Sequence, residues 1–474
     1  MRAWSSFQSS ELAGVIDDPK VLTLKGRLLK DLARLATGEE RQRLYSQASD
    51  AYLAANALEQ DSYPLINAAA LACFAGDHER AQTIAAQVLG LIESDPNEGE
   101  TAYWREATIA EAYLLMGEVE QACAALRRAY NKLPFAHEDQ AATLGQFDRI
   151  IEAQSGDPSW LEPFRVPCSV NFVSATKASP SEEISGAMSD ALEDLAPGYG
   201  FCGLSGAHDL IFAEQILKCG AELSLVFTTE PQETIRTVFE PLGQDWVERF
   251  RAVVEAATQT ELLPSAMSED PLAQEVRVQV AYLVAMGHSL RRSEALRSRA
   301  DCLLITDGVG SSPLSSEVWS RAGSAMRVID VRHHNGADAA TLKHGVELDG
   351  LVFAKDPEAF SRLGPFPGLT PSREGERIYW RGAIDAVATA IFDLIAPKSE
   401  AQLSFHFGHP ASQKVPASLI DRMERSARAA HPAKVKTGFQ SAMIAKVMRP
   451  GIRLEELGEI QTLSGQSALW SVSV

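Results

Sequence analysis

The amino-acid sequence predicts a multidomain chain of α and α/β class, in which a helical array precedes a doubly wound parallel sheet. Two observations lead to this prediction. The first 160 residues contain three copies of a helix-turn-helix pattern, spaced by about 40 residues. Between residues 165 and 335, apolar strand patterns alternate with helix patterns, as in parallel sheets with helices on both faces. We therefore expect domains over 1–160, 165–335 and 340–474.

The composition limits the classes of partner. The 474 residues are 45% hydrophobic and 23% charged, which is typical of a soluble globular protein. The net charge of −19 repels polyanions and argues against nucleic acid as a partner. Apolar runs are too short for a membrane span, and the N-terminal residues lack the pattern of a signal peptide. The six cysteines are scattered, which favours reduced thiols in a cytoplasmic protein.

The helical array is identified from its internal similarity. Two segments, Tyr63 to Leu89 and Tyr103 to Ala129, each contain a helix pattern, a turn and a second helix pattern. Their turn glycines are Gly76 and Gly117, and an earlier copy centres on Gly38. One hairpin cannot bury its apolar face alone, so we expect the hairpins to stack into a superhelix with a concave surface.

This pattern resembles tetratricopeptide repeats in a slightly long variant, and it is similar to the repeat region called the TRAFs-binding domain. The resemblance implies that the array binds a protein partner or packs against a neighbouring domain. Four aromatic residues could line a peptide groove, although aromatic residues at helical spacing are typical of a buried core. Both interpretations are open for Tyr63, Tyr103, Trp104 and Tyr113.

The central domain is organised around the segment from Gly200 to Phe227, which predicts a turn, a helix and a buried strand. The turn consists mainly of small residues, including Gly203, Ser205 and Gly206. A small-residue loop that opens a helix after a strand can present backbone N–H groups and the helix dipole to a phosphate. The alternative is a tight turn that only lets the helix and strand pack.

A second turn of the same kind follows the apolar strand pattern at residues 302–306. It contains Asp307, Gly308, Gly310, Ser311 and Ser312. Ligands of doubly wound sheets bind at the carboxyl ends of the strands, near the switch in strand order. We therefore expect the two turns to converge on a nucleotide-derived ligand.

Acidic side chains beside the two turns are further candidates. Asp209 and Glu214 lie in the helix after the first turn, and Glu317 lies in the helix after the second. Asp209 and Glu214 are candidates for binding the ligand, and Glu214 and Glu317 are candidates for a catalytic carboxylate. For Glu214, the alternative is a solvated or hydrogen-bonded helix carboxylate.

The segment from Ser205 to Phe227 resembles the Rossmann-like SLOG superfamily, which includes DNA-processing proteins and cytokinin-releasing phosphoribohydrolases. It is more similar still to a domain found beside bacterial class III cyclases, through the runs GAHDLIFAE and GAEL. The resemblance covers about residues 165–335 and implies binding of a nucleotide-derived ligand, with N-glycosidic hydrolysis in some relatives. The PGGxGTxxE loop of the hydrolases is replaced by the segment from Gly308 to Glu317.

Residues 340–474 contain short matches, in the right order, to class III nucleotide cyclases. The segment from Leu348 to Leu363 resembles the strand and loop of the first metal-binding Asp, which falls at Asp356. Glu376 stands where the second metal-binding Asp is expected. The run from Ile420 to Arg425 resembles the helix that serves the transition state, and Arg425 matches its Arg. The resemblance implies a small α+β domain, with Mg²⁺ as a cofactor only if cyclase activity is retained.

Three departures from the family argue against cyclase activity. Fewer residues separate Asp356 from Glu376 than separate the metal ligands of family members, so helices of the first unit are missing. Pro357 removes an N–H donor from the loop that should hold phosphate, and Asp421 replaces an Asn where it would repel a triphosphate. We predict a shortened, non-catalytic domain that supports a homodimer or transmits a signal. An active cyclase and an unrelated α/β extension are the alternatives.

Together these patterns predict a cytoplasmic regulatory or sensor protein that binds a nucleotide-derived ligand in its central domain and a protein partner through its repeats. The first alternative is an enzyme. It would be a nucleotide N-glycosidase that uses Glu214 or Glu317, or a cyclase that uses Asp356, Glu376 and Arg425. The second alternative is a scaffold whose central sheet holds no ligand.

Overall fold

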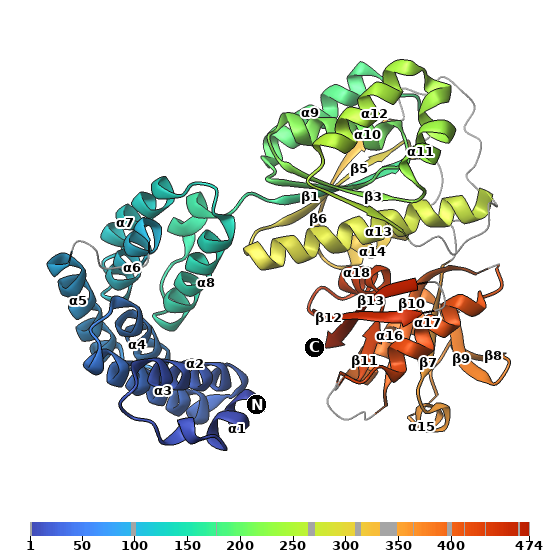
Figure 1. Ribbon diagram of the computed structural model, residues 1–474. Coiled ribbons are helices and arrows are strands. Elements are labelled where there is room, and N and C mark those ends of the chain that lie inside the picture. Colours follow the sequence, from blue (N-terminus) through green and yellow to red (C-terminus); the bar gives the residue numbers. More distant parts are fainter. Residues whose placement is uncertain are drawn as a thin grey trace. The chain divides into compact units, whose positions relative to one another are not determined.

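The computed structural model describes residues 2–95, 101–176, 178–263, 271–308, 314–331, 348–363, 365–395, 401–411, 413–431, 433–462 and 465–473. The chain divides into two compact units (Figure 1). The first comprises Met1–Val166 with Ala295–Arg297, and the second comprises Pro167–Glu294 with Ser298–Val474.

The first unit is helical, which confirms the predicted repeat of helical hairpins. Its hairpins are α2–α3 (Pro19–Leu35, Gly38–Leu58), α4–α5 (Ser62–Phe74, His78–Ser94) and α6–α7 (Ala102–Leu115, Val119–Lys132), followed by α8 (His137–Ala153). The segment α1 (Arg2–Gln8) and short turns at Glu11–Gly14 and Ser159–Phe164 flank them. Gly38, expected at the centre of a turn, is instead the first residue of α3, with φ of 57°.

Gly76 and Gly117, the other two turn glycines, each end a helix and do so with the same hydrogen bonds. The Gly76 N–H donates to the carbonyl of Cys73 (2.9 Å), and the Asp77 N–H donates to that of Ala72 (3.0 Å). Gly117 begins an equivalent pair of hydrogen bonds. Both glycines have a left-handed backbone, with φ of 88° and 82°, which a side chain disfavours. The glycine turn therefore stops each helix and satisfies its last carbonyls.

The aromatic residues of the array lie mostly in its core. Tyr103 is 2% exposed, and its hydroxyl lies 2.9 Å from Oγ1 of Thr143. Trp104 and Tyr113 are partly buried against neighbouring core residues. Tyr63 is 53% exposed and is the one of the four that remains free to contact a partner.

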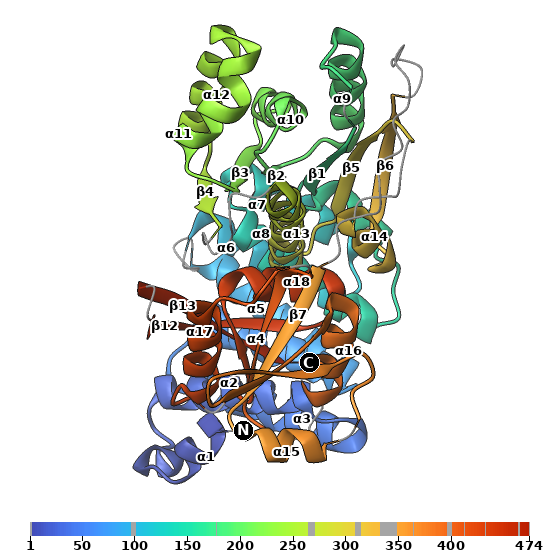
Figure 2. The same ribbon diagram turned by 90° about the vertical axis from the view of Figure 1, so that its right-hand side faces the viewer.

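The second unit begins with a six-stranded sheet in which all strands are parallel. Its strands are β1 (Ser169–Ala175), β2 (Tyr199–Gly203), β3 (Glu222–Phe227), β4 (Gln259–Leu262), β5 (Ala300–Thr306) and β6 (Ala325–Asp330). One face is covered by α9 (Glu182–Leu195), α10 (Ala207–Lys218) and α12 (Gln244–Ala256), and the other by α13 (Pro271–Leu296) and α14 (Leu314–Arg321) (Figures 1 and 2). A short α11 (Pro231–Thr234) follows β3. The predicted doubly wound parallel sheet is confirmed.

Two elements of this sheet domain differ from expectation. The edge strand β4 was not predicted, because its residues Gln259 to Leu262 are mostly polar and exposed. The apolar pattern from Val276 to Met286 predicts a helix, and α13 extends beyond that segment at both ends. Only the continuous apolar part of a helix is recognisable by its pattern, whereas the ends depend on packing.

The strand order is β4-β3-β2-β1-β5-β6. The chain runs outward from β1 to β4 and then returns to β5 on the other side of β1. The switch in strand order therefore lies between β1 and β5, whose last residues Ala175 and Thr306 are partners in the ladder. In sheets of this kind, the crevice outside the carboxyl ends at the switch is the usual ligand site.

The remaining residues form a mixed sheet of seven strands, ordered β12-β13-β11-β10-β7-β9-β8. Its elements are β7 (Leu348–Ala354), α15 (Pro357–Arg362), β8 (Thr370–Glu374), β9 (Arg377–Ala383), α16 (Ile384–Ile395), β10 (Leu403–Pro410), α17 (Ala417–Arg428), β11 (Val435–Thr437), α18 (Phe439–Met448), β12 (Arg453–Thr462) and β13 (Gly465–Ser473). The strands β9 and β10, connected by α16, form a split β-α-β unit in which β7 lies between them and is antiparallel to both. The edge strand β8 is antiparallel to β9. The mixed sheet with its helices agrees with an α+β class, while the likeness to cyclases stays a prediction.

Two general expectations can be compared with the described residues. The six cysteines are all unpaired. Over the described part of the chain, no helix is both long enough and apolar enough to cross a membrane.

Candidate functional site

The turn after β2 opens α10, as the sequence predicted, but its hydrogen-bond donors face a side chain of the same helix. The N–H and the hydroxyl of Ser205 both donate to Oδ2 of Asp209, each at 2.8 Å. The hydroxyl of Tyr282 on α13 donates to Oδ1 of Asp209 at 3.0 Å. Gly203 allows the close approach of α13, because a Cβ there would lie 2.9 Å from Cβ of Ala281.

The buried carboxylate changes what this turn can hold. Asp209 is 1% exposed, and burial raises its pKa to about 6, against the opposing effect of its hydrogen bonds. At neutral pH, Asp209 is therefore mostly ionised and occupies the place expected for a phosphate. A phosphate at Ser205 and Gly206 would have to displace it or be repelled by it.

The turn after β5 meets the loop after β1 at the switch point. The hydroxyl of Thr176 donates to Oδ2 of the buried Asp307 at 2.9 Å. The Gly308 N–H donates to Oγ1 of Thr306 at 3.1 Å, with φ of 67° at the glycine. The β2 and β5 turns lie at the same edge of the sheet, with β1 between their strands. The other three predicted residues of this turn are outside the described residues: Gly310, Ser311 and Ser312.

The two candidate catalytic glutamates lie in different surroundings. Both carboxylate oxygens of Glu214 accept hydrogen bonds from Arg249 of α12, each at 2.8 Å. Glu317 is exposed in the first turn of α14. Because α10 and α14 cover opposite faces of the sheet (Figure 2), the fold does not bring these two carboxylates together. The bidentate ion pair agrees with the structural interpretation of Glu214.

The cyclase-like candidates are also spread out. Asp356 is exposed and caps α15, accepting a hydrogen bond from the N–H of Ala359 at 2.9 Å. Glu376 is exposed in the turn between β8 and β9. Arg425 lies 3.0 Å from Oδ2 of Asp421, in an ion pair within α17. In the described ranges, no group of three or more His, Cys, Asp or Glu residues is placed to hold a metal ion.

The helical array contains a polar cluster that sequence reasoning missed. We call it the Lys30 cluster, and it comprises Lys30 and Arg34 of α2, Asn67 of α4, Glu111 of α6 and Arg149 of α8. Nζ of Lys30 donates to Oδ1 of Asn67 at 3.2 Å. Glu111 and Arg149 both bond to the side chain of Gln146, at 3.0 and 2.6 Å. The cluster therefore joins the first helices of successive hairpins.

The Lys30 cluster concentrates positive charge. Burial, followed by the charges of Arg34 and Arg149, lowers the pKa of Lys30 to about 8. Burial raises the pKa of Glu111 to about 7. Neither Lys30 nor Arg149 forms an ion pair with a carboxylate among the described residues. In the sequence, each of these helices has a polar or charged residue of the cluster, which is a weak signal. The residues come together only because the hairpins stack.

Comparisons with known proteins concern mainly the helical array. A family model described as Tetratricopeptide Repeats-Sensor matches residues 5–72. A search among curated proteins finds no match.

Two solved structures show weak similarity. An O-GlcNAc transferase mutant from Thermobaculum terrenum is 13% identical, over 65% of this chain and 57% of that chain, with a TM-score of 0.21. LpoA from Haemophilus influenzae is 12% identical, over 66% of this chain and 71% of that chain, with a TM-score of 0.14. Scores this low do not inform the fold. The comparisons therefore support a sensor-type tetratricopeptide repeat array in the N-terminal region.

Proposed function

We propose that this chain is a regulatory protein whose helical array binds an acidic segment of a partner protein at the Lys30 cluster. The observation that supports the proposal most directly is a pair of half-buried cations, Lys30 and Arg149, that form no ion pair with a carboxylate among the described residues. Cations removed from water are costly unless an anion compensates them. Because the chain has a net charge of −19, most of its surface repels an acidic partner, whereas the Lys30 cluster attracts one.

The similarity to the repeat-sensor family supports the same location. The matched residues 5–72 contain three members of the cluster, Lys30, Arg34 and Asn67. Repeat arrays of stacked hairpins commonly present an extended surface to partner proteins. Tyr63, exposed at the start of α4, adds an aromatic contact for an apolar residue of the partner.

A labelled acidic peptide of ten residues tests this assignment by fluorescence anisotropy with the full chain. We expect binding that weakens with salt, and a loss of about tenfold or more in Lys30→Met and Arg149→Gln. Arg128→Gln is the matched control, since Arg128 is exposed on α7 and already paired with Glu106 at 2.9 Å. Equal affinity in all four proteins would remove the Lys30 cluster from the proposal.

The proposal also assigns a nucleotide-derived ligand to the central parallel sheet. Support comes from the strand order, which puts the switch between β1 and β5, and from Thr176 and Asp307, whose hydrogen bond joins the two loops there. Because Asp209 fills the Ser205 turn, we assign the ligand to the β1–β5 crevice rather than to that turn. Calorimetry with AMP, ATP, NAD and cyclic nucleotides tests this part, and failure of all of them to bind would disprove it.

In this proposal the C-terminal domain is non-catalytic and provides the contact of a homodimer. The enzymatic alternatives have less support, because Glu214 is engaged by Arg249 and Asp356 caps a helix. Incubation with ATP, GTP, AMP or NAD and Mg²⁺ or Mn²⁺ distinguishes them, through free base or cyclic product. Sedimentation analysis tests the homodimer.

A further inference from the structure

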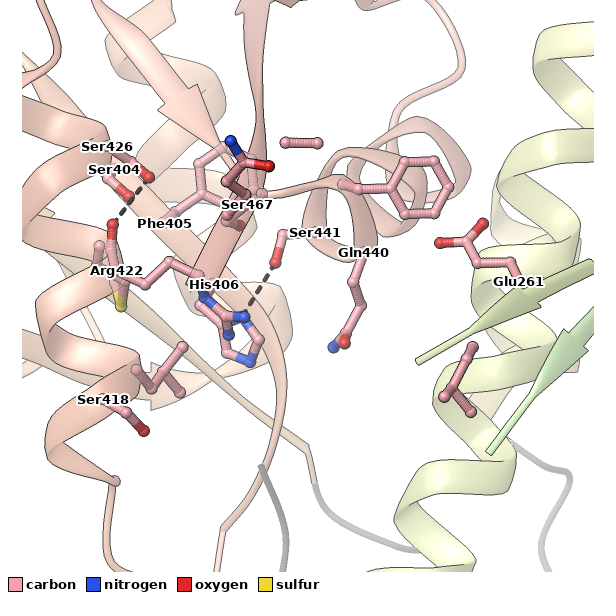
Figure 3. Close-up of a pocket in the computed structure, with 17 residues that line it drawn as sticks. Glu261, Ser404, Phe405, His406, Ser418, Arg422, Ser426, Gln440, Ser441 and Ser467 are labelled. Atoms are coloured by element: carbon pink, nitrogen blue, oxygen red, sulfur yellow. Dashed lines mark hydrogen bonds between the residues drawn. The ribbon is translucent and has the colours of Figure 1, made fainter. Parts of the chain in front are cut away.

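A cavity of about 370 Å³ lies in the C-terminal part of the second unit, outside every site discussed above. It is bordered by β10, α17, α18 and β13, with β4 at one side (Figure 3). The described part of its wall is rich in hydroxyl groups and has one guanidinium. The residues that matter for its chemistry are Ser404, His406, Arg422, Ser426, Ser441 and Ser467.

The position of these side chains follows from the register of the sheet. His406 of β10 is the ladder partner of Leu351 of β7, and Ser404 is the partner of Phe353. Directly opposite residues share a face of an antiparallel pair. Leu351 and Phe353 pack against α17, so His406 and Ser404 face the same helix. Polar residues thus replace apolar ones where β10 faces α17, and the cavity opens there.

Arg422 of α17 is an uncompensated cation. Its guanidinium forms no hydrogen bond or ion pair with any residue that the structure describes. The other arginines of this helix are paired, Arg425 with Asp421 at 3.0 Å and Arg428 with Glu424 at 3.1 Å. Burial lowers the pKa of Arg422, but a guanidinium does not lose its proton in a protein. Arg422 is half-buried and lines the cavity, so it loses part of its hydration without an ion pair to replace it.

The neighbouring His406 is neutral and does not share the positive charge. Burial, and then the charge of Arg422, moves the pKa of His406 well below its usual range. Its Nδ1 lies 3.3 Å from the hydroxyl of Ser441, which also accepts the N–H of Phe407 at 2.9 Å. If the Ser441 hydroxyl donates to Nδ1, the Nε2–H of His406 remains as a second hydrogen-bond donor.

The cavity wall does not neutralise Arg422. Among the lining residues that the structure describes, Glu261 of β4 is the one carboxylate, and it lies across the cavity from Arg422 (Figure 3). The carboxylate is already engaged, with Oε2 at 3.1 Å from Nε2 of His288. The serine hydroxyls are neutral donors. The cavity therefore has the polarity of a site for an anion.

We propose that this cavity binds a small organic monoanion, a carboxylate or a phosphodiester, whose charged group pairs with Arg422. The oxygens of that group accept hydrogen bonds from the guanidinium, from Nε2–H of His406 and from the hydroxyls of Ser404 and Ser467. The hydroxyl of Ser426 is already engaged, because it donates to the carbonyl of Arg422 at 2.9 Å. One cation balances one negative charge, so a phosphate monoester or a triphosphate would leave negative charge unpaired in the cavity. The volume suits a small metabolite. The proposal is independent of the Lys30 cluster and of the β1–β5 crevice.

The stability of the ligand-free protein gives the first test. Because Arg422 is uncompensated, Arg422→Met should raise the melting temperature of the full chain by about 2–4 °C. The matched control is Arg428→Met on the same helix, which breaks an exposed ion pair and should shift it by about 1 °C or less. A fall in the melting temperature of Arg422→Met would show that the arginine supports the fold, and would overturn the proposal.

Binding gives the second test, with benzoate and diethyl phosphate as the two monoanions, benzamide as the uncharged analogue and sulfate as a dianion. Calorimetry should show that at least one monoanion binds, about tenfold or more tightly than benzamide or sulfate. The preferred monoanion identifies the ligand as a carboxylate or a phosphodiester. Arg422→Met should lose this binding, Arg422→Lys should retain part of it, and Arg428→Met should keep it. The proposal is wrong if neither monoanion binds at about 10 mM or if Arg422→Met binds as the wild type does.

Discussion

Replacing Glu111 with Gln should stabilise the protein, and the gain should grow as the pH rises. Glu111 is half-buried on α6, where its carboxyl accepts a hydrogen bond from Gln146 of α8 at 3.0 Å. Burial raises its pKa to about 7, in spite of the nearby charges of Lys30 and Arg149. Gln retains the acceptor oxygen but does not ionise.

The sign and size follow from the two pKa values. A carboxyl with a raised pKa is no burden below its ordinary value of 4.5, where it is protonated in both states. It destabilises the fold progressively as the pH rises from 4.5 to about 7, and the loss is complete above that pH. The full cost of ionisation is roughly 3 kcal/mol, since one pKa unit corresponds to about 1.4 kcal/mol. Gln also removes a compensating charge from Lys30 and Arg149. We therefore expect the gain to increase by on the order of 1–2 kcal/mol between about pH 5.5 and about pH 8.

Urea unfolding of the full chain at the two pH values measures this gain from the transition of the array. Variants that replace Trp104 or Trp160 identify that transition by the fluorescence change they remove. Glu120→Gln on α7 is the control, because it removes the same charge from an exposed position. A gain for Glu111→Gln that is equal at both pH values, or a loss of stability at about pH 8, would refute the electrostatic reasoning.

Three further predictions concern the second unit. Asp209→Asn should lower the free energy of unfolding by about 1–3 kcal/mol. Ser205 and Tyr282 now donate to two different carboxylate oxygens of Asp209, whereas an amide offers only one acceptor oxygen. An unchanged urea midpoint would contradict this prediction. Gly350→Ala should cost about 1–3 kcal/mol, since its Cβ would lie 2.6 Å from Cβ of Val387, whereas Gly186→Ala, with nothing near its Cβ, should be neutral or stabilising; the two melting temperatures test the contrast. Asp356→Asn should leave stability within about 0.5 kcal/mol, because Asn caps helices as well as Asp does, and a cyclic product that it abolished would instead restore the cyclase alternative.

Local patterns were sufficient to predict much of the fold. The repeated glycine turns at Gly76 and Gly117 depend on residues a few positions apart, so they are visible in the sequence. The helix α10 and the strands β3 and β5 have strong apolar patterns and lie where they were expected. The edge strand β4 lacked such a pattern, because an exposed edge does not require apolar side chains.

The candidate sites were less predictable, because each depends on contacts between distant residues. The Ser205 turn had the composition of a phosphate loop, yet its donors bond to Asp209, and the hydroxyl that completes this arrangement belongs to Tyr282 on another helix. Glu214 meets Arg249, which lies 35 residues away. A side chain's type suggests what it can do, but its partner decides what it does.

The sequence by itself determined the class of the protein: stacked helical hairpins, a doubly wound parallel sheet, and a strongly acidic net charge. These properties follow from periodicity, turn residues and total charge, which are local or additive. Only the tertiary structure decided which charged groups lack a partner. Lys30 and Arg149 converge because hairpins stack, and Arg422 is uncompensated because the acids of α17 pair with other arginines. Compensation of a buried charge is a property of its surroundings in space, and spacing along the chain does not show it.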